Sequence, residues 1–205
     1  MSYLILVRHG ESLWNERGLW TGWTDIGLSE KGKEEARLAG EKLKGLSINL
    51  AYTSVLIRAK QTLNEIKGVL GAEFPTTESA ALNERDYGIY TKKNKFEIQK
   101  EVGDEQFKKI RRGWDIPIEN GESLKDVYGR VVPYYESEIL PKLKEGKNIL
   151  ISAHGNSLRA LVKHLENISD SDVENLEIST GEVYIYSLDS RGNISSKKIL
   201  PIKNN

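Results

Sequence analysis

The sequence YLILVRHGES at residues 3–12 is the stretch from which the fold can be predicted. Its first five residues are apolar or aromatic, which predicts a strand buried on both faces of a sheet. The run then changes to Arg8, His9 and Gly10, and ligands of open α/β sheets bind at the carboxyl ends of the strands. His9 is therefore a candidate nucleophile or anion-binding residue, with an ordinary polar loop after a strand as the alternative.

A second unit of the same kind lies near the other end of the chain. Residues 148–153, with the sequence NILISA, predict another buried strand, and His154, Gly155 and Asn156 follow it directly. Residues 157–162 then predict a capped helix. Two of the three histidines of the chain occupy this strand–histidine–glycine context. The pattern indicates one site built on His9 and His154.

The composition is that of a soluble globular protein. Apolar residues make up 38% and charged residues 29% of 205 residues, which suits one domain at 1–205 with a lid-like insertion at about 83–122. The 30 basic and 30 acidic residues balance, so the ligand is expected to be a small anion, not nucleic acid or a membrane. The absence of cysteine excludes disulfide and thiolate chemistry. No signal peptide or membrane span is predicted, so we expect a cytoplasmic protein, monomeric or homo-oligomeric.

Serine residues mark the predicted starts of several helices. Ser29, Ser54 and Ser123 each precede residues with helical apolar spacing, and Ser169 has a capping arrangement with the acid three residues later. Pro133 falls inside the third pattern and predicts a kink or a break, because proline has no N–H to donate. The helices expected after these serines cover about residues 30–44, 55–70, 124–135 and 170–176.

Predicted strands alternate with these helices. Pro75 lies near the start of one strand and places it at a sheet edge, where a missing N–H is tolerated. The alternation predicts an α/β fold, a three-layer sandwich with a mainly parallel central sheet and helices on both faces. The strands expected besides the two histidine units cover residues 50–53, 74–77, 183–188 and 194–200.

Positive charge gathers in two places that an anionic ligand would explain. Arg58 is predicted in the first turn of a helix, where a cation opposes the macrodipole unless it shares an anion with the helix terminus. The segment with Lys92–Lys95 and Arg111-Arg112 is basic and weakly periodic, which suits a lid that closes over an anionic substrate. The alternatives are a surface arginine and a solvated helical hairpin.

Phosphoryl transfer is the chemistry that fits these residues best. A neutral His9 can attack phosphorus, while Arg8, Arg58 and a protonated His154 supply the charge compensation that metal ions supply elsewhere. No metal-ligand spacing and no Gly-x-Ser-x-Gly motif is present. Gly10 and Gly155 would leave space for the phosphate, with Asn15 and Asn156 as donors. The leaving alkoxide needs a proton, and spacing does not choose between Glu84 and Glu11.

The motifs resemble those of a known family over nearly the whole chain. Residues 6–12 with Trp14-Asn15 are similar to the signature of the histidine phosphatase superfamily. The resemblance narrows to its 2,3-bisphosphoglycerate-dependent phosphoglycerate mutases through Thr21-Gly22-Trp23, Thr53-Ser54, Arg58-Ala59, Gln61-Thr62, Leu82-Asn83-Glu84-Arg85, Tyr87-Gly88, Asn94-Lys95, Arg111-Arg112, Asp115-Ile116-Pro117, residues 121–126 and residues 153–161.

The resemblance implies a phosphoglycerate mutase-like fold and a metal-independent enzyme of glycolysis and gluconeogenesis. Such an enzyme interconverts 3-phosphoglycerate and 2-phosphoglycerate through a phosphohistidine primed by 2,3-bisphosphoglycerate. It implies a phosphohistidine at His9, a proton donor and acceptor at Glu84, and stabilisation by His154, Arg8 and Arg58. The substrate contacts that it implies are Arg8, Gly10, Glu11, Ser12, Asn15, Thr21, Gly22, Arg58, Glu84, Arg85, Tyr87, Lys95, Arg111, Arg112, Gly155 and Asn156.

The sequence departs from that family at three places. Asp86 stands where a histidine is usual and adds negative charge near an anionic site. The segment between Pro117 and Gly121 is short, so the subunit contacts that this segment makes in longer family members are left open. Little chain follows the last strand, so it is also open whether water is excluded from the phosphohistidine. The alternatives are therefore a phosphatase of the same superfamily and a non-catalytic phosphometabolite-binding protein. His164 is expected on a helix surface without a catalytic part.

Overall fold

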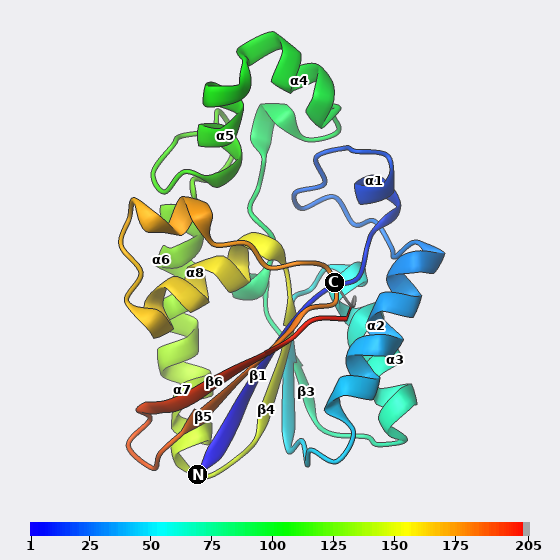
Figure 1. The fold of residues 1–205 in the computed structure, drawn as a ribbon, viewed down its shortest axis with the longest axis vertical. Helices are drawn as coiled ribbons and strands as arrows, with labels where there is room; N and C mark the ends of the chain where they lie inside the picture. The colour runs from blue at the N-terminus through cyan, green and yellow to red at the C-terminus, as the bar shows by residue number, and fades with distance from the viewer. Residues whose placement is uncertain (203–205) are drawn as a thin grey trace.

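The computed structural model describes residues 1–202, so the end of the short tail, 203–205, lies outside the described residues. The fold is built on one six-stranded sheet in the order β3-β2-β4-β1-β5-β6 (Figure 1). β1 to β4 are parallel and β5 and β6 antiparallel, which confirms the mainly parallel α/β prediction. The strands are β1 Ser2–Arg8, β2 Leu50–Thr53, β3 Thr76–Glu78, β4 Ile149–Ala153, β5 Val183–Leu188 and β6 Ile194–Leu200.

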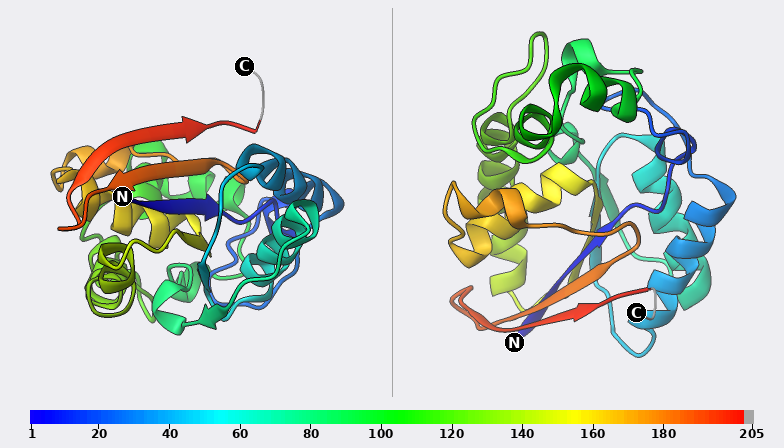
Figure 2. Two further views of the ribbon diagram at one scale, coloured as in Figure 1. Left: turned by 90° about the horizontal axis from the view of Figure 1, so that it is seen from below. Right: turned by 45° about the horizontal axis from the view of Figure 1, so that its top comes forward.

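Helices cover both faces of this sheet. α2 and α3 lie on one face and α6, α7 and α8 on the other, while α4 and α5 lie beyond the carboxyl ends of the parallel strands (Figures 1 and 2). The helices are α1 Leu13–Glu16, α2 Glu30–Leu43, α3 Ile57–Leu70, α4 Lys95–Val102, α5 Asp104–Arg112, α6 Leu124–Tyr134, α7 Leu140–Lys144 and α8 Gly155–Glu166. Among the described residues, no helix is both long and apolar enough to cross a membrane.

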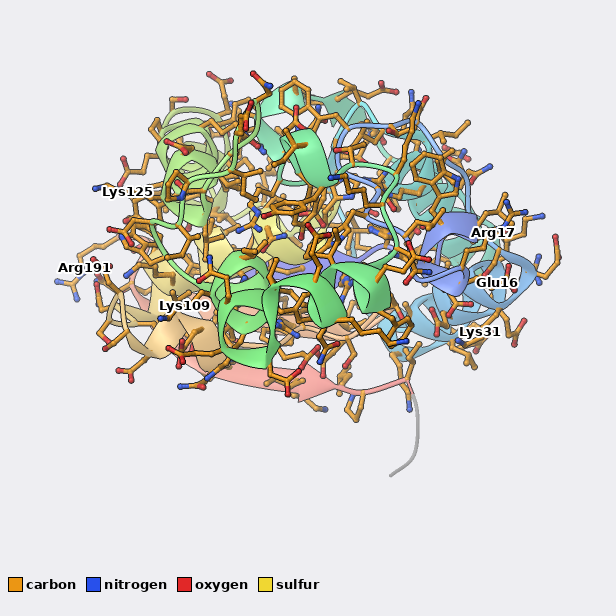
Figure 3. The ribbon with its side chains drawn as sticks, turned by 90° about the horizontal axis from the view of Figure 1, so that it is seen from above. Glu16, Arg17, Lys31, Lys109, Lys125 and Arg191 are labelled. Atoms are coloured by element: carbon orange, nitrogen blue, oxygen red, sulfur yellow. The ribbon has the colours of Figure 1, made fainter. Side chains whose placement is uncertain are left out.

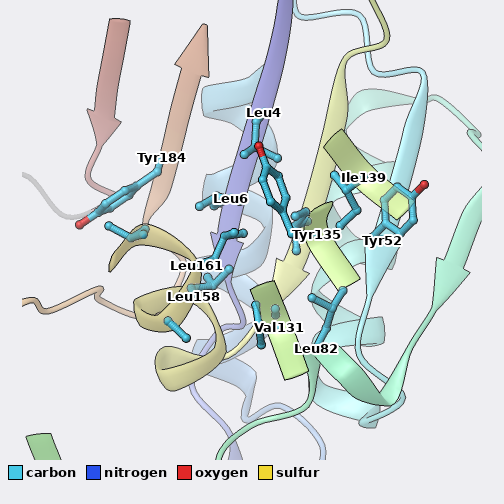
Figure 4. Packing of buried hydrophobic residues seen from close by; sticks show 14 of the residues in the cluster. Leu4, Leu6, Tyr52, Leu82, Val131, Tyr135, Ile139, Leu158, Leu161 and Tyr184 are labelled. Atoms are coloured by element: carbon cyan, nitrogen blue, oxygen red, sulfur yellow. The ribbon is translucent and has the colours of Figure 1, made fainter. Parts of the chain in front are cut away.

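Alternate residues of β1 bury into two separate cores. Leu4 and Leu6 pack with α6 and α8 in one cluster, part of which Figure 4 shows. Ile5 and Val7 pack with α2 and α3 in the other. Because successive side chains of a strand point to opposite faces, a strand between two helical layers must be apolar at every position. The continuous apolar run at residues 3–7 is therefore the signature of a central strand.

Most predicted elements are confirmed, and several of their ends differ. β3 is Thr76–Glu78 and not residues 74–77, and α8 begins at Gly155, before the predicted start at residue 157. Ser29 and Ser123 cap α2 and α6 as expected. α3 begins at Ile57 after Leu56, not after Ser54. The Ser54 hydroxyl accepts from Leu56 N at 3.2 Å, whereas Asp25 Oδ1 accepts from Ile57 N at 2.6 Å. The helix expected to reach residue 176 is a short 3₁₀ turn, Asp172–Asn175.

Pro133 marks a change of helical geometry, as predicted. α6 ends one residue beyond it, and residues 135–139 continue as a π-helical segment into α7. Because proline cannot donate the regular helical hydrogen bond, the backbone around it is free to take wider spacing. The buried Tyr135 and Ile139 of this segment reach the main core.

The weakly periodic middle of the chain has a small core of its own. α4 and α5 form a helical pair, and their inner residues pack with Trp20 and Tyr87. The short segment before Gly121 lies against residues 86–89, where Ile89 N donates to Glu119 O at 3.1 Å. Figure 3 looks down on this end of the molecule and labels Lys109 of α5.

Two helical glycines should respond oppositely to alanine. Gly32 lies in α2, and a Cβ there would lie 1.9 Å from Glu11 O, whereas a Cβ at Gly129 in α6 meets nothing within 4 Å. We expect Gly32→Ala to lower the free energy of unfolding by about 1–3 kcal/mol, because the backbones must separate. Gly129→Ala should raise it by about 0.5–1 kcal/mol through helix propensity. Chemical denaturation measures both, and a stabilised Gly32→Ala protein would contradict the close packing.

Candidate active site

A cavity opens where β1 and β4 end, and it gathers most of the residues predicted from the sequence. His9 follows β1 and Gly155 begins α8 after β4. Backbone N–H of His9 donates to Ala153 O at 2.9 Å, which ties the two strand ends together. The lining residues are Arg8, His9, Asn15, Trp20, Thr21, Gly22, Arg58, Glu84, Tyr87, Lys95, Arg111, Arg112, Gly155, Asn156, Arg159 and Ile178.

One hydrogen bond sets which nitrogen of His9 is free. Nδ1 of His9 lies 2.6 Å from the carbonyl oxygen of Gly10. Because a carbonyl only accepts, Nδ1 must carry the proton in this contact, and Nε2 keeps the lone pair of a neutral ring. The side chain is buried, with 3% of its surface exposed. This geometry is compatible with the nucleophilic role predicted for His9 from the sequence.

His154 lies directly behind His9. The ring centroids are 4.9 Å apart and the planes are inclined by 62°. A 2.6 Å hydrogen bond joins Nε2 of His154 to the hydroxyl of Ser54. Nδ1 of His154 is buried without a hydrogen-bond partner. The parallel strands have therefore placed both predicted histidines in one site.

The cavity has a strong positive charge. Six of its lining residues are cations, Arg8, Arg58, Lys95, Arg111, Arg112 and Arg159, against the carboxylate of Glu84. Carbonyl oxygens of Gly22 and Thr24 accept from the Arg58 guanidinium at 2.7 and 3.0 Å, so this buried arginine is held in place. The arrangement attracts a multiply charged anion.

Several donors at the cavity are buried without a partner. They are Nε of Arg8, Nε1 of Trp20 and Oγ1 of Thr21. A buried polar group without a hydrogen bond is costly, so such groups in a cavity indicate a ligand that supplies acceptors. Phosphate and carboxylate oxygens are acceptors of this kind.

Burial and neighbouring cations hold both histidines in the neutral form. Burial, followed by Arg58 and Arg8, lowers the pKa of His9 well below its ordinary value. Burial, followed by Arg58 and His9, does the same to the pKa of His154. The sequence led us to expect a protonated His154, whereas the free site favours a neutral ring. Only an anion bound next to it would restore a preference for the charged form.

Glu84, not Glu11, faces the cavity. Oε1 of Glu84 accepts from the backbone N–H of Arg85 at 2.8 Å and from Asn156 N and Nδ2 at 3.1 and 3.0 Å. The other oxygen, Oε2, lies next to Gly155 of the cavity wall, because a Cβ built on that glycine would be 3.7 Å from it. Glu11 instead pairs with the exposed Lys31 at 2.6 Å. The structure thereby separates the two carboxylates that spacing left open.

Four predicted substrate contacts lie outside the lining. Gly10 packs on α2, because a Cβ there would lie 2.0 Å from Gly32 O, so its small size serves packing and not the phosphate space we expected. Ser12 caps α1 and donates to Oδ1 of Asn15, leaving the Asn15 amide nitrogen for the cavity. Glu11 is the carboxylate paired with Lys31.

The side chains of Arg85 and Asp86 both make hydrogen bonds to backbone groups of the protein. Arg85 is fully buried, donates to Ile110 O, and lies 4.6 Å from the centroid of the Tyr87 ring. Asp86, the family departure, accepts from Gly88 N at 2.9 Å and does not line the cavity. The extra negative charge is thus used to stabilise a turn.

Sequence reasoning missed Arg159. Its Nη1 donates to Oδ1 of Asn156 at 2.9 Å, and its other nitrogens donate to carbonyl oxygens of residues 112, 173 and 176. It therefore orients the amide that bonds Glu84. The available signal was an arginine three residues after Asn156, on a helix whose neighbouring positions are apolar. Trp20 and Ile178 also line the cavity and were also missed, and Trp20 brings the unpartnered Nε1 donor.

The geometry alone would allow a metal ion. One ligand atom from each of His9, Glu84 and His154 lies within 4.8 Å of the others. Arg8 and Arg58, however, lie beside the same histidines and lower their pKa values. A field that disfavours a proton on these rings also disfavours a divalent cation. The residues fit an anionic group better than a metal.

The chain is similar in sequence and in structure to known proteins. The histidine phosphatase superfamily (branch 1) matches residues 4–198. A protein of Chelativorans sp. strain BNC1, named 2,3-bisphosphoglycerate-dependent phosphoglycerate mutase, is 50% identical over 200 residues, covering 96% of this chain and 97% of that protein. Bacillus stearothermophilus YhfR is 27% identical with a TM-score of 0.81, covering 95% and 94% of the two chains. Mycobacterial hydrolase 1, at 22% identity, 98% coverage of both chains and a TM-score of 0.82, shares the fold.

The neutral state of His9 should depend on Arg58. We expect the imidazole of His9 in the free protein to titrate below its ordinary pKa, and Arg58→Gln to raise that pKa because a neighbouring cation is lost. NMR titration of the histidine ring signals measures both values. Arg37→Gln, which removes a surface arginine paired with Glu65, is the matched control and should leave the titration unchanged. An equal pKa in wild type and Arg58→Gln would refute this cause.

Proposed function

The chain belongs to the histidine phosphatase superfamily and, within it, to the 2,3-bisphosphoglycerate-dependent phosphoglycerate mutases, and from this membership we propose that it interconverts 3-phosphoglycerate and 2-phosphoglycerate. The observation that carries the proposal is the neutral, Nδ1-protonated His9 next to Glu84 in a cavity lined by six cations. A nucleophile, a proton-transferring carboxylate and an anion-binding wall are the three parts that the reaction needs.

The proposed chemistry takes place in two matched transfers. Nε2 of His9 attacks a phosphorus of 2,3-bisphosphoglycerate, the P–O bond to the carbon chain breaks, and Glu84 gives its proton to the leaving oxygen. The phosphohistidine then transfers the same group to the free hydroxyl of a monophosphoglycerate, whose proton returns to Glu84. Transfer to one hydroxyl and removal from the other isomerises the substrate and regenerates the bisphosphate.

The remaining lining residues divide into two proposed groups. The first group, Arg8, Arg58, Asn15 and His154, surrounds the transferring phosphoryl group. The negative charge of that group favours the protonated form of His154. Tyr87 hydrogen-bonds Asn156 at 2.8 Å, so it belongs to the same network as Glu84. The residues proposed to hold the rest of the substrate are Thr21, Gly22, Tyr87, Lys95, Arg111, Arg112, Gly155 and Asn156.

The wider assignments are also proposals. The protein acts as one domain whose α4–α5 pair is the lid over the cavity, because Lys95 and Arg111 of these helices both line it. It works without a metal and in the cytoplasm, as a step of glycolysis and gluconeogenesis. A phosphatase of the same superfamily would use the same His9 but give the phosphoryl group to water. Arg111 and Arg112 line the cavity, and the proposal that they bind the substrate's carboxylate favours the mutase.

Turnover should require His9 and the bisphosphate. We expect rapid formation of 2-phosphoglycerate from 3-phosphoglycerate that depends on trace 2,3-bisphosphoglycerate and is unaffected by a chelator. His9→Ala should abolish it, and Glu84→Gln should lower kcat by roughly 10²–10⁴-fold, because general acid–base catalysis is lost. A coupled assay that follows 2-phosphoglycerate and free phosphate together makes the measurement. Phosphate release without isomerisation would establish the phosphatase, and no turnover of either kind would leave the non-catalytic binding protein.

Substrate capture should weaken at alkaline pH. Burial, with Arg111 and Arg8 nearby, lowers the pKa of Lys95 to about 8. Its ammonium group is charged below this pH and neutral above it, so we expect kcat/KM for 3-phosphoglycerate to fall as the pH rises through about 8. Lys95→Arg keeps the charge at this pH and should lack this limb. Identical pH profiles for the two proteins would show that Lys95 does not set it.

A further inference from the structure

The carboxylate of Glu84 is carried by a backbone that no helix or strand supports. Glu84 lies between two 3₁₀ turns, Ala80–Leu82 and Gly88–Tyr90. Buried carbonyl groups in such a segment lack the regular partners of a helix or strand and need others, such as side-chain donors. Proton transfer to two different substrate oxygens also requires that the carboxylate be held at one place. The segment that positions Glu84 must therefore be fixed from outside.

Arg130 of α6 supplies these partners. Its Nη1 donates to Ala81 O at 2.8 Å and to Asn83 O at 3.0 Å, and its Nη2 donates to Glu84 O at 2.9 Å. The neighbouring Val131 is fully buried in the main core, so the helix that carries Arg130 is anchored there. The rigidity of the core thus reaches the backbone of Glu84 through one guanidinium.

Glu122 fixes the guanidinium itself. Its two carboxylate oxygens accept from Nε and Nη2 of Arg130 at 2.8 and 2.9 Å, a bidentate pair. One of these oxygens also accepts from Asp86 N at 2.9 Å, on the other side of Glu84. Both side chains are only 19% exposed, which protects the pair from solvent. Arg130 and Glu122 together bracket residues 81–86.

The hydrogen-bond inventory of Arg130 is complete. A guanidinium has five N–H groups, and the two carboxylate contacts and three carbonyl contacts account for all of them. Arg130 does not line the cavity, so it is not an anion-binding residue. Nε1 of Trp23 adds a donor to Glu84 O at 2.6 Å, which joins the loop after Thr21 to the same carbonyl.

We propose that Arg130, oriented by Glu122, is the positioning residue for the proton transfer by Glu84, an inference that rests on the proposed function. It acts by fixing the backbone of residues 81–84 and does not contact the substrate. A lysine keeps the charge at this position but has three donors on a single nitrogen and no planar fork. Arg130→Lys therefore loosens the carboxylate without removing the cation.

The effect of Arg130→Lys on two phosphate esters can distinguish a loss of acid positioning from general damage to the site. The alkoxide that leaves a phosphoglycerate needs a proton, whereas the phenolate of p-nitrophenyl phosphate leaves without one. We expect Arg130→Lys to lower kcat for 3-phosphoglycerate by about 10–100-fold with a smaller change in KM. The rate of p-nitrophenolate release in a single turnover, in which His9 Nε2 displaces the aryl oxygen and retains the phosphoryl group, should stay within about twofold of wild type.

A double-variant cycle tests whether Arg130 acts through Glu84. In a Glu84→Gln background, Arg130→Lys should cause no further loss of isomerisation, because the acid is already absent. Glu122→Gln should lower isomerisation in the same direction, and it provides a second variant if Arg130→Lys does not fold by circular dichroism. Arg37→Lys is the matched control, because Arg37 is a surface residue of α2 that pairs with two acidic side chains, Glu34 and Glu65.

The outcomes divide cleanly. Loss of isomerisation with retained aryl ester cleavage and no added loss in Glu84→Gln supports the proposal. Equal loss with both esters, no loss at all, or a full additional loss in Glu84→Gln overturns it. If the wild type cleaves p-nitrophenyl phosphate but does not isomerise phosphoglycerates, the proposed function fails. Glycerol 3-phosphate then replaces 3-phosphoglycerate as the ester that needs a proton, and the same comparison decides the role of Arg130.

Discussion

The parallel pairing of β1 with β4 is the constraint on which the site depends. Their register places Arg8 opposite Ala153, so His9 and His154 follow as neighbours at one sheet edge. A slip of one residue would exchange the two faces of β1 between the cores, so that each core would receive side chains that fit the other, and it would move His9 away from His154. The same pairing brings the start of α8 beside the end of β1, which gives Asn156 access to Glu84.

Charge and burial act together at this edge. A buried site with several arginines is unfavourable while empty, and it is stabilised by an anion that pairs with the cations and satisfies free donors. Burial and the same arginines lower the pKa of His9, which favours the neutral ring. The cations that would bind the anion therefore also favour the form of His9 that the proposed mechanism needs. The carbonyl of Gly10 holds the ring proton on Nδ1, which leaves Nε2 unprotonated.

Much of the fold was predictable because its signals are local. Central strands had continuous apolar runs, and Ser29 and Ser123 cap the helices that follow them. Ser54 misled the prediction of a helix start, since the first N–H of α3 donates to Asp25, which lies 32 residues away in the chain. The motif residues that line the cavity could be named from the resemblance, but Gly10 and Glu11 could not be separated from them by spacing. Their positions depend on contacts with α2.

The sequence by itself determined which residue types occur in which order along the chain. They are two apolar runs that each end in a histidine, several arginines and a small number of candidate carboxylates. Only the tertiary structure decided that Glu84 faces His9, that Arg159 orients Asn156 and that Arg130 holds the backbone of Glu84. The reason is physical. Strand and cap signals come from neighbours within a few residues, whereas a guanidinium finds its carbonyls across 46 residues of chain, at distances that only packing sets.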